Sequence, residues 1–336
     1  MTAPAPRANP RLEGHAAAEA LLAEGMRTGR LHHAWLLTGP PGIGKATLAY
    51  RFARRLFAGV PEGNSLALPA GHPVFRRVAT GSHADLLTIE REWDPKRKKL
   101  RSEIVVDDVR RIAGFLHRTA AEGGWRVVVV DGAETLNSNA ENALLKVLEE
   151  PPPRAMLLLA CSAAGRLLPT IRSRCRRLPL SPLPEETVAA LLADYLPEAN
   201  AATRARLAAL ADGSPGRALR LAETGGGAAA LVDQVMAELP RIDVLRAHAV
   251  ADALGREDEP FATFMELLSA GLATAVRDAG RGRADPDQLR LLGGRPLDAW
   301  VHVWHALVRL QDETEGAYLD KRQAIVTGLL MLSQDD

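Results

Sequence analysis

A glycine-rich loop between an apolar run and an amphipathic stretch constrains this chain more than any other feature. The apolar run 34–38 comes first, the stretch 45–58 follows, and between them lies Gly39-Pro40-Pro41-Gly42-Ile43-Gly44-Lys45-Ala46-Thr47. Glycines let backbone N–H groups wrap an anion at a helix N-terminus, and the lysine can reach the phosphate oxygens. With this glycine and lysine content the spacing arises by chance only about 0.04 times per chain. We therefore predict a phosphate-binding loop (P-loop) rather than a simple glycine-rich turn.

The first half of the chain alternates short apolar runs with amphipathic stretches. Further strands are predicted at 85–90, 126–131, 155–161 and 175–180, and helices at 15–28, 105–121 and 139–150. Such alternation is typical of a parallel sheet covered on both faces. The stretch 59–82 has little periodicity and is predicted to be an irregular loop. The charged stretch 91–102 is predicted to be a hairpin or a flexible excursion.

Strand patterns disappear after Pro184. Helical patterns run over 185–223, end at the glycines 225–227, and resume over 228–333. The predicted fold class is therefore α/β plus all-α. The predicted divisions are a disordered leader (1–10), a P-loop α/β domain (11–182), a small helical domain (183–226) and a C-terminal helical domain (227–336).

Charge and composition exclude several classes of protein. The chain has 42 basic and 41 acidic side chains among 336 residues, which argues against coating nucleic acid or a membrane by overall charge. No apolar run approaches the ~20 residues of a spanning helix, and the first ten residues lack the apolar core of a signal peptide. Two cysteines cannot form a four-ligand zinc site or a disulfide framework. We expect a cytoplasmic protein without membrane contact.

Two positions depart from an active nucleotide-hydrolysing site. Ala46 stands where a serine or threonine would bind Mg²⁺, and Thr47 is turned about 100° away on a helix. Asp131 ends an apolar strand and could hold Mg²⁺ through water, although a strand-end aspartate is the alternative. Gly132 follows where a glutamate would orient the attacking water, and Glu134 is expected to face elsewhere. These features predict little or no hydrolysis.

Together these motifs resemble AAA+ clamp-loader subunits. The matching segments are Gly39–Thr47, 127–134, NALLKVLEEPP (142–152) and Ser173-Arg174-Cys175. Within that group the chain is most similar to the delta-prime subunits of bacterial DNA polymerase III. That similarity rests on HAWLL (33–37), GSHADL (81–86), VDDVR (106–110), the degraded acidic motif and GSPGRAL (213–219).

The resemblance implies a stator in a ring that loads a sliding clamp on primed DNA. Its partners would be gamma/tau motor subunits, a delta subunit, the clamp and, through the complex, primer-template DNA. The helical domains would be a lid and an oligomerisation collar. Arg174 would be an arginine finger acting in trans on a neighbour's ATP, although composition alone makes it one of several surface arginines. The chain's own P-loop would hold ATP or ADP, with Mg²⁺ disfavoured.

Other positions transfer less directly from the family. Ser162 occupies the place of a polar sensor or of a capping serine, and Arg217 lies near a second sensor arginine but is more simply structural. Many relatives carry a four-cysteine zinc module, whereas 59–82 contains no cysteine, so no zinc is expected. The cluster Lys96-Arg97-Lys98-Lys99 is either a DNA-contacting loop or, more often for such clusters, a solvated tip.

Two other functions compete with a non-hydrolysing subunit. An ATP-hydrolysing gamma/tau-like motor subunit would share the same motifs, but Ala46 and Gly132 argue against it. A small-molecule kinase would explain the P-loop, yet it explains neither Ser173-Arg174-Cys175 nor the helical domains.

Overall fold

The computed structural model describes residues 4–95, 98–122, 124–255, 258–317 and 319–333. The chain forms two compact units, residues 1–217 and 218–336, and the boundary falls inside one helix. The division into three domains predicted above stays a prediction. None of the described helices is long and apolar enough to cross a bilayer.

A five-stranded parallel sheet organises the first unit. Its strand order is β2-β5-β6-β1-β7, with bounds Leu86–Ile89, Arg126–Asp131, Ala155–Cys161, Ala34–Thr38 and Arg176–Pro179. Strands β1 and β6 are buried along their whole length, as the continuous apolar runs require of a sheet covered on both faces. The predicted α/β core is therefore confirmed.

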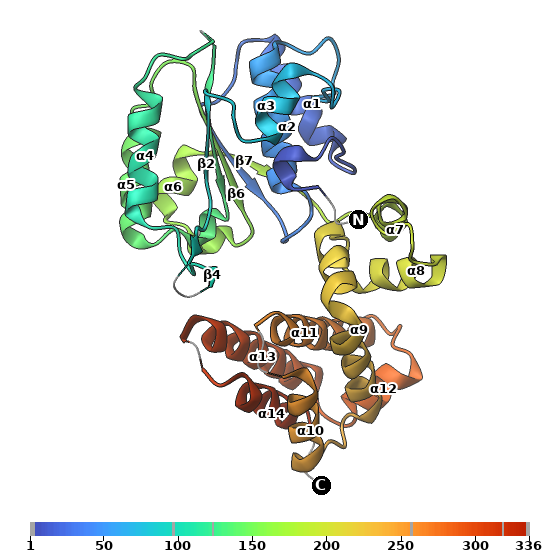
Figure 1. Ribbon diagram of the computed structural model, residues 1–336. Coiled ribbons are helices and arrows are strands. Elements are labelled where there is room, and N and C mark those ends of the chain that lie inside the picture. Colours follow the sequence, from blue (N-terminus) through green and yellow to red (C-terminus); the bar gives the residue numbers. More distant parts are fainter. Residues whose placement is uncertain (1–3, 96–97, 123, 256–257, 318, 334–336) are drawn as a thin grey trace. The chain divides into compact units, whose positions relative to one another are not determined.

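Helices cover both faces of this sheet (Figure 1). On one face lie α1 (Ala16–Arg27), α2 (Lys45–Ala58) and α3 (Pro73–Ala79), and on the other α4 (Val106–Leu116), α5 (Ser138–Glu149) and α6 (Pro169–Arg174). Successive strand residues point to opposite faces, so Trp35 and Leu37 join one core while Ala34 and Leu36 join the other. Asn137 caps α5 by accepting a hydrogen bond from the Ala140 amide.

The structure differs from the sequence predictions at two places in the first unit. The stretch 59–82 is not wholly irregular, because Pro73 starts helix α3, which His72 caps. The leader predicted as disordered contains a short 3-10 helix at Pro6–Ala8 and is tied down by the arginines of α2. Arg51 Nη1 donates to the Pro10 carbonyl at 2.7 Å and Arg54 Nη2 to the Asn9 carbonyl at 2.9 Å. Sequence periodicity cannot register such long-range side-chain anchors.

The remaining helices are α7 (Glu185–Tyr195), α8 (Ala201–Leu210), α9 (Pro215–Glu238), α10 (Val244–Leu254), α11 (Asp258–Gly280), α12 (Pro286–Leu292), α13 (Leu297–Ala317) and α14 (Lys321–Leu332). Helix α9 runs through the glycines 225–227, which were predicted to end a helix. Glycine weakens a helix by only about 1 kcal/mol per residue, and the flanking helical sequence outweighs that. In the second unit, Trp300 is buried and donates from Nε1 to the Leu292 carbonyl at 2.9 Å.

Candidate functional site

The predicted P-loop joins β1 to α2 at the carboxyl end of β1, which lies between β6 and β7 in the sheet. Gly39, Gly42 and Gly44 have φ of 148°, 76° and 106°, values that favour glycine. Within the part of the chain that the structure describes, the amide N–H groups of residues 42, 44 and 45 have no hydrogen-bond acceptor. Free amides at a helix N-terminus attract anions, so the backbone fits a phosphate.

The carbonyl groups of the same loop are all hydrogen-bonded within the protein. Lys45 Nζ donates to the carbonyls of Gly39 and Pro40 at 2.8 and 2.7 Å. The other loop carbonyls accept from His15, Leu48, Ser214 and Gly216. His15 Nε2 lies 2.7 Å from the Ile43 carbonyl, so Nε2 carries the proton. The loop is therefore held from three segments of the chain: the residue that precedes α1, helix α2, and residues 214–216 around the start of α9.

Lys45 gathers the acidic and polar residues predicted for the site. Its Nζ also donates to Ser162 Oγ at 2.9 Å, and the Ser162 amide donates to Glu134 Oε2 at 3.0 Å. Glu134 therefore turns back toward the loop, whereas the sequence led us to expect that it faces elsewhere. The reason is a 3-10 turn at Ala133–Thr135 after β5. Gly132, with φ of 79°, immediately precedes this turn.

Burial shapes the charges of this cluster. Burial lowers the pKa of Lys45, and the negative charges of Glu134 and Asp131 oppose that shift. Burial and the nearby Glu90 raise the pKa of Asp131, while Lys45 opposes the rise. One lysine thus faces two carboxylates in a partly desolvated site, an arrangement that favours the ammonium form of Lys45 over what burial alone would give.

The metal-binding half of the site remains incomplete. Ala46 offers no hydroxyl, and Thr47, the next residue on α2, is buried. Among the described residues, no cluster of three or more His, Cys, Asp and Glu side chains is placed to hold a metal ion. Cys161 and Cys175 are buried free thiols, and burial raises the pKa of both to about 12.

The segment 213–217 packs directly on the P-loop, a contact that sequence reasoning missed. Ser214 Oγ donates to the Pro41 carbonyl at 2.7 Å, and the Gly216 amide donates to the Gly42 carbonyl at 3.0 Å. Arg217, the second possible sensor, donates its amide to Ser214 Oγ at 3.2 Å. Gly213 and Gly216 are visible in the sequence, but their segment's contact with the P-loop is not, because the two segments lie about 170 residues apart in the chain.

We predict that Gly216→Ala loosens this contact. An added Cβ would come within 2.8 Å of Gly42 Cα and 3.0 Å of the Gly42 oxygen, both backbone atoms that cannot move aside cheaply. Overpacking of this kind costs about 1–3 kcal/mol of unfolding free energy. Gly227→Ala is the matched control in the same helix, since its Cβ would meet nothing within 4 Å and should slightly stabilise the helix. Urea unfolding measures both, and equal effects would contradict the prediction.

Arg174 lies at the end of α6, with partners outside the Lys45 cluster. Its Nη2 forms an ion pair with Glu149 Oε1 at 2.8 Å, and Nη1 donates to the Thr170 carbonyl at 3.1 Å. Its side chain is 36% exposed. The described contacts thus leave it at the surface and separate from the chain's own P-loop residues.

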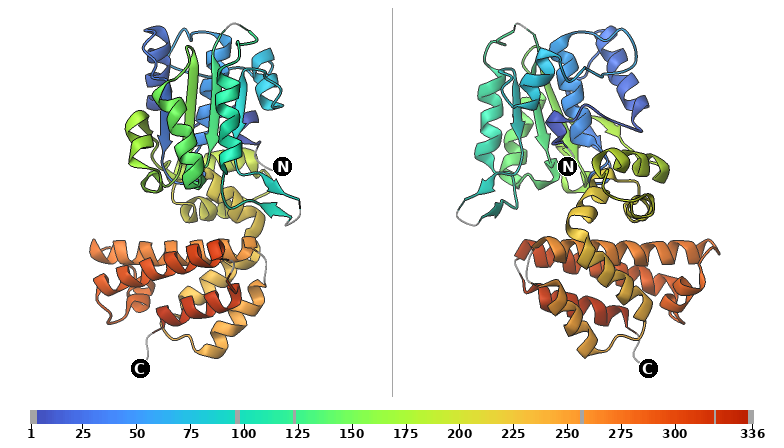
Figure 2. Two further views of the ribbon diagram at one scale, coloured as in Figure 1. Left: turned by 90° about the vertical axis from the view of Figure 1, so that its left-hand side faces the viewer. Right: turned by 45° about the vertical axis from the view of Figure 1, so that its right-hand side comes forward.

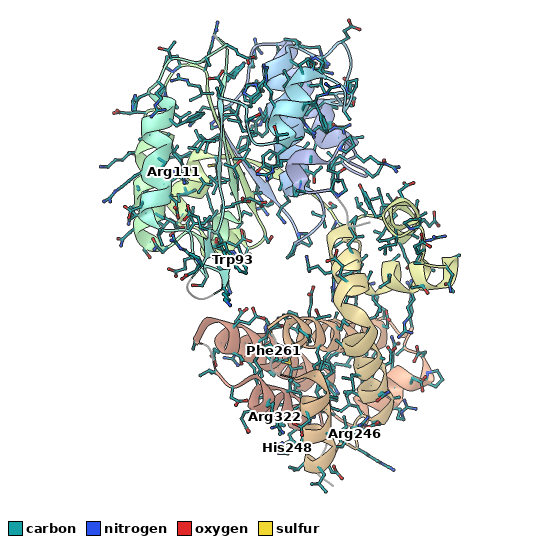
Figure 3. All side chains as sticks on the ribbon, viewed as in Figure 1. Trp93, Arg111, Arg246, His248, Phe261 and Arg322 are labelled. Carbon is teal, nitrogen blue, oxygen red and sulfur yellow. The ribbon has the colours of Figure 1, made fainter. Side chains whose placement is uncertain are left out.

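The basic insertion forms a two-stranded hairpin, β3 (Trp93–Asp94) with β4 (Lys99–Leu100), as one of the two predicted alternatives. Figure 2 shows it standing out from the α/β layers, and Figure 3 shows Trp93 on it. Glu92, at its base, pairs with Arg101 and Arg111 at 3.4 and 3.5 Å. Lys98 is exposed, whereas Lys96 and Arg97 lie outside the described residues, and of the Lys99 side chain nothing is described. DNA contact by Lys96, Arg97, Lys98 and Lys99 stays a prediction.

Comparisons with known proteins add an independent finding. The family model described as "DNA polymerase III, delta subunit" matches residues 14–184. The DNA polymerase III subunit delta' of Pseudomonas aeruginosa is 41% identical over 190 residues, 56% of this chain and 55% of its own. That of Escherichia coli K12 is 38% identical over 196 residues, 58% and 56% of the two chains. The chain thus spans about half the length of these curated relatives.

Subunits called gamma and tau also match. The tau subunit of Salmonella typhimurium is 32% identical over 267 residues, 76% of this chain and 39% of its own. A solved gamma-subunit-related protein of Thermotoga maritima aligns with 93% of this chain and 98% of its own, at 18% identity and a TM-score of 0.44. Since the family model covers half of the chain and relatives called delta' are 38–41% identical over 190 and 196 residues, the chain belongs to the delta-prime family of DNA polymerase III clamp-loader subunits.

Proposed function

We propose that this chain is a non-hydrolysing stator of a clamp loader, and that it supplies Arg174 to ATP on a neighbouring motor subunit. The observation that carries the proposal is the placement of Arg174. Its side chain on α6 is 36% exposed, and its partners are Glu149 and Thr170 rather than the Lys45 cluster. A cation at the surface, apart from its own P-loop, is suited to act on a phosphate held by another chain.

The chain's own P-loop supports nucleotide binding better than hydrolysis. Its free amides and Lys45 fit phosphate oxygens, with ATP or ADP as the ligand. The charges of Asp131 and Lys45 interact, but the hydroxyl that would bind a Mg²⁺ ion together with Asp131 is missing at Ala46. Gly132 carries no carboxylate, and the nearby Glu134 is bound to the Ser162 amide. Ser162 would sense the state of the loop through Lys45, while we assign Arg217 a structural role.

The proposed partners follow from the family. They are gamma/tau motor subunits, a delta subunit and the sliding clamp, with primer-template DNA reached through the assembled complex. The near-neutral total charge fits a subunit that does not hold DNA alone. The second helical unit is proposed as the collar that joins this chain to the others.

The purified chain is expected to bind nucleotide yet show no measurable ATP turnover with Mg²⁺, because the metal hydroxyl and the base are both absent. Turnover near one per second, within the usual range for enzymes of this type, would instead support the motor-subunit alternative that the gamma and tau relatives raise. Titration calorimetry with ATP and ADP measures binding, and phosphate release measures turnover. Lys45→Ala is the control, since it should abolish binding without unfolding the unit.

Assembly supplies the second arm of this test. Mixed with gamma/tau and delta subunits, the chain should enter a stable complex and accelerate its ATP hydrolysis. A chain that turns over ATP alone and does not co-purify with those subunits would contradict the proposed function altogether.

A further inference from the structure

The ion pair between Arg174 and Glu149 joins the ends of two helices. Glu149 is the last residue of α5 and Arg174 the last of α6, and the two helices pack against each other. The Glu149 carboxylate lies 2.8 Å from Arg174 Nη2, and the Thr170 carbonyl accepts from Nη1 at 3.1 Å. One carboxylate and one carbonyl thus fix the guanidinium on two of its nitrogens.

Helix stability does not explain a carboxylate at this position. The C-terminus of a helix carries partial negative charge, so a glutamate there is electrostatically unfavourable for α5. Nor does the ion pair explain it, because pairs this exposed, 36% and 48% for the two side chains, contribute little to folding. What the pair does provide is a defined direction for a long and otherwise mobile side chain.

The fixed guanidinium keeps further N–H groups for another ligand. Arginine is a planar fork of N–H donors, of which the described contacts occupy one on Nη1 and one on Nη2. A phosphate approaching the surface can therefore meet the remaining donors without displacing Glu149. Holding such a group in place before the reaction lowers the entropy lost when the transition state forms.

We propose that Glu149 is a positioning residue for Arg174: it holds the guanidinium in the orientation that reaches ATP on the neighbouring subunit. This inference rests on the proposed function of Arg174 as an arginine finger. Glu149 does not touch the ATP itself, and its effect passes entirely through Arg174.

The test is Glu149→Gln in the reconstituted clamp loader, measured by single-turnover ATP hydrolysis at the site that faces this chain. The substitution keeps the shape and removes the charge. The rate constant should fall between about 10- and 100-fold, the scale of a misplaced group, with ATP affinity and assembly unchanged. Glu150→Gln is the matched control, because the side chain of this adjacent exposed glutamate has no described partner and its backbone bond to the Lys146 carbonyl is kept; it should leave the rate unchanged.

A double variant separates a positioning role from a general one. If Glu149 acts through Arg174, then Glu149→Gln in an Arg174→Ala background causes no further loss. A further loss of tenfold would show an independent role and overturn the inference. So would a normal rate for Glu149→Gln in a complex where Arg174→Ala is impaired. If Arg174→Ala is itself without effect, the proposed function fails first, so the two failures are distinguishable. An unchanged melting temperature of the Glu149→Gln chain confirms that folding is intact.

Discussion

Replacing Arg174 by alanine should lower ATP hydrolysis at the neighbouring motor site by about 10³-fold, the lower end of what an arginine finger contributes. The guanidinium would neutralise charge that develops on the transferred phosphate, and alanine supplies no substitute. Because the side chain is 36% exposed and its ion pair is a surface pair, the chain itself should fold and assemble normally.

Measuring this effect requires a complex in which only the site facing this chain can hydrolyse ATP. Single-turnover phosphate release then reports that site alone. Arg172→Ala is the control, since Arg172 is an exposed arginine of the same helix. An Arg174→Ala complex that hydrolyses ATP at the normal rate would refute the arginine-finger assignment, whereas equal losses for both variants would point to a general charge effect.

Replacing Trp35 by alanine should destabilise the first unit by about 3–5 kcal/mol, which is the usual cost of emptying a large aromatic site. Trp35 is 1% exposed on the interior strand β1 and packs in the core beneath α1 and α2. The neighbouring Arg176 holds its guanidinium carbon 4.9 Å from the centre of the indole ring, a cation–π contact that is also lost.

Trp35→Phe separates the effect of lost side-chain volume on stability from the effect of the unpaired indole N–H. Among the described residues none accepts a hydrogen bond from Trp35 Nε1, so this buried N–H is itself unfavourable, by about 1–3 kcal/mol. Phenylalanine removes it while keeping an aromatic ring, and should therefore cost less than half as much as alanine. Trp93→Ala is the surface control, because Trp93 is 59% exposed and should shift stability by less than about 0.5 kcal/mol. Urea unfolding followed by circular dichroism ranks the three, and a Trp93 effect as large as that of Trp35 would contradict the argument.

The sequence was sufficient for the α/β core because its strands are apolar throughout. Runs such as 126–131 and 155–161 can only be buried strands or short buried helices, and their spacing with helices selects a parallel sheet. The P-loop was equally clear, since its glycine spacing has a physical meaning that no packing context alters. Asp131, Ser162 and Lys45 were named from motif position, and the structure brings them together.

Features that depend on contacts between distant segments escaped prediction. Glu134 returns to the site because of a single 3-10 turn, whose direction periodicity does not report. Ser214 and Gly216 meet the P-loop only in the folded chain. Helix α9 passes through three glycines because its flanks favour a helix strongly enough. In each case a local propensity was overridden by tertiary contacts or by the remainder of the element.

The hydrogen bonds of Lys45 have a consequence for how nucleotide would arrive. Nζ already donates to Gly39, Pro40 and Ser162, so its three protons are occupied by the protein. An incoming phosphate must therefore compete with these internal acceptors, and only the difference between the two sets of bonds contributes to affinity. The internal acceptors of Lys45 therefore reduce the net gain that a bound phosphate would obtain from this lysine.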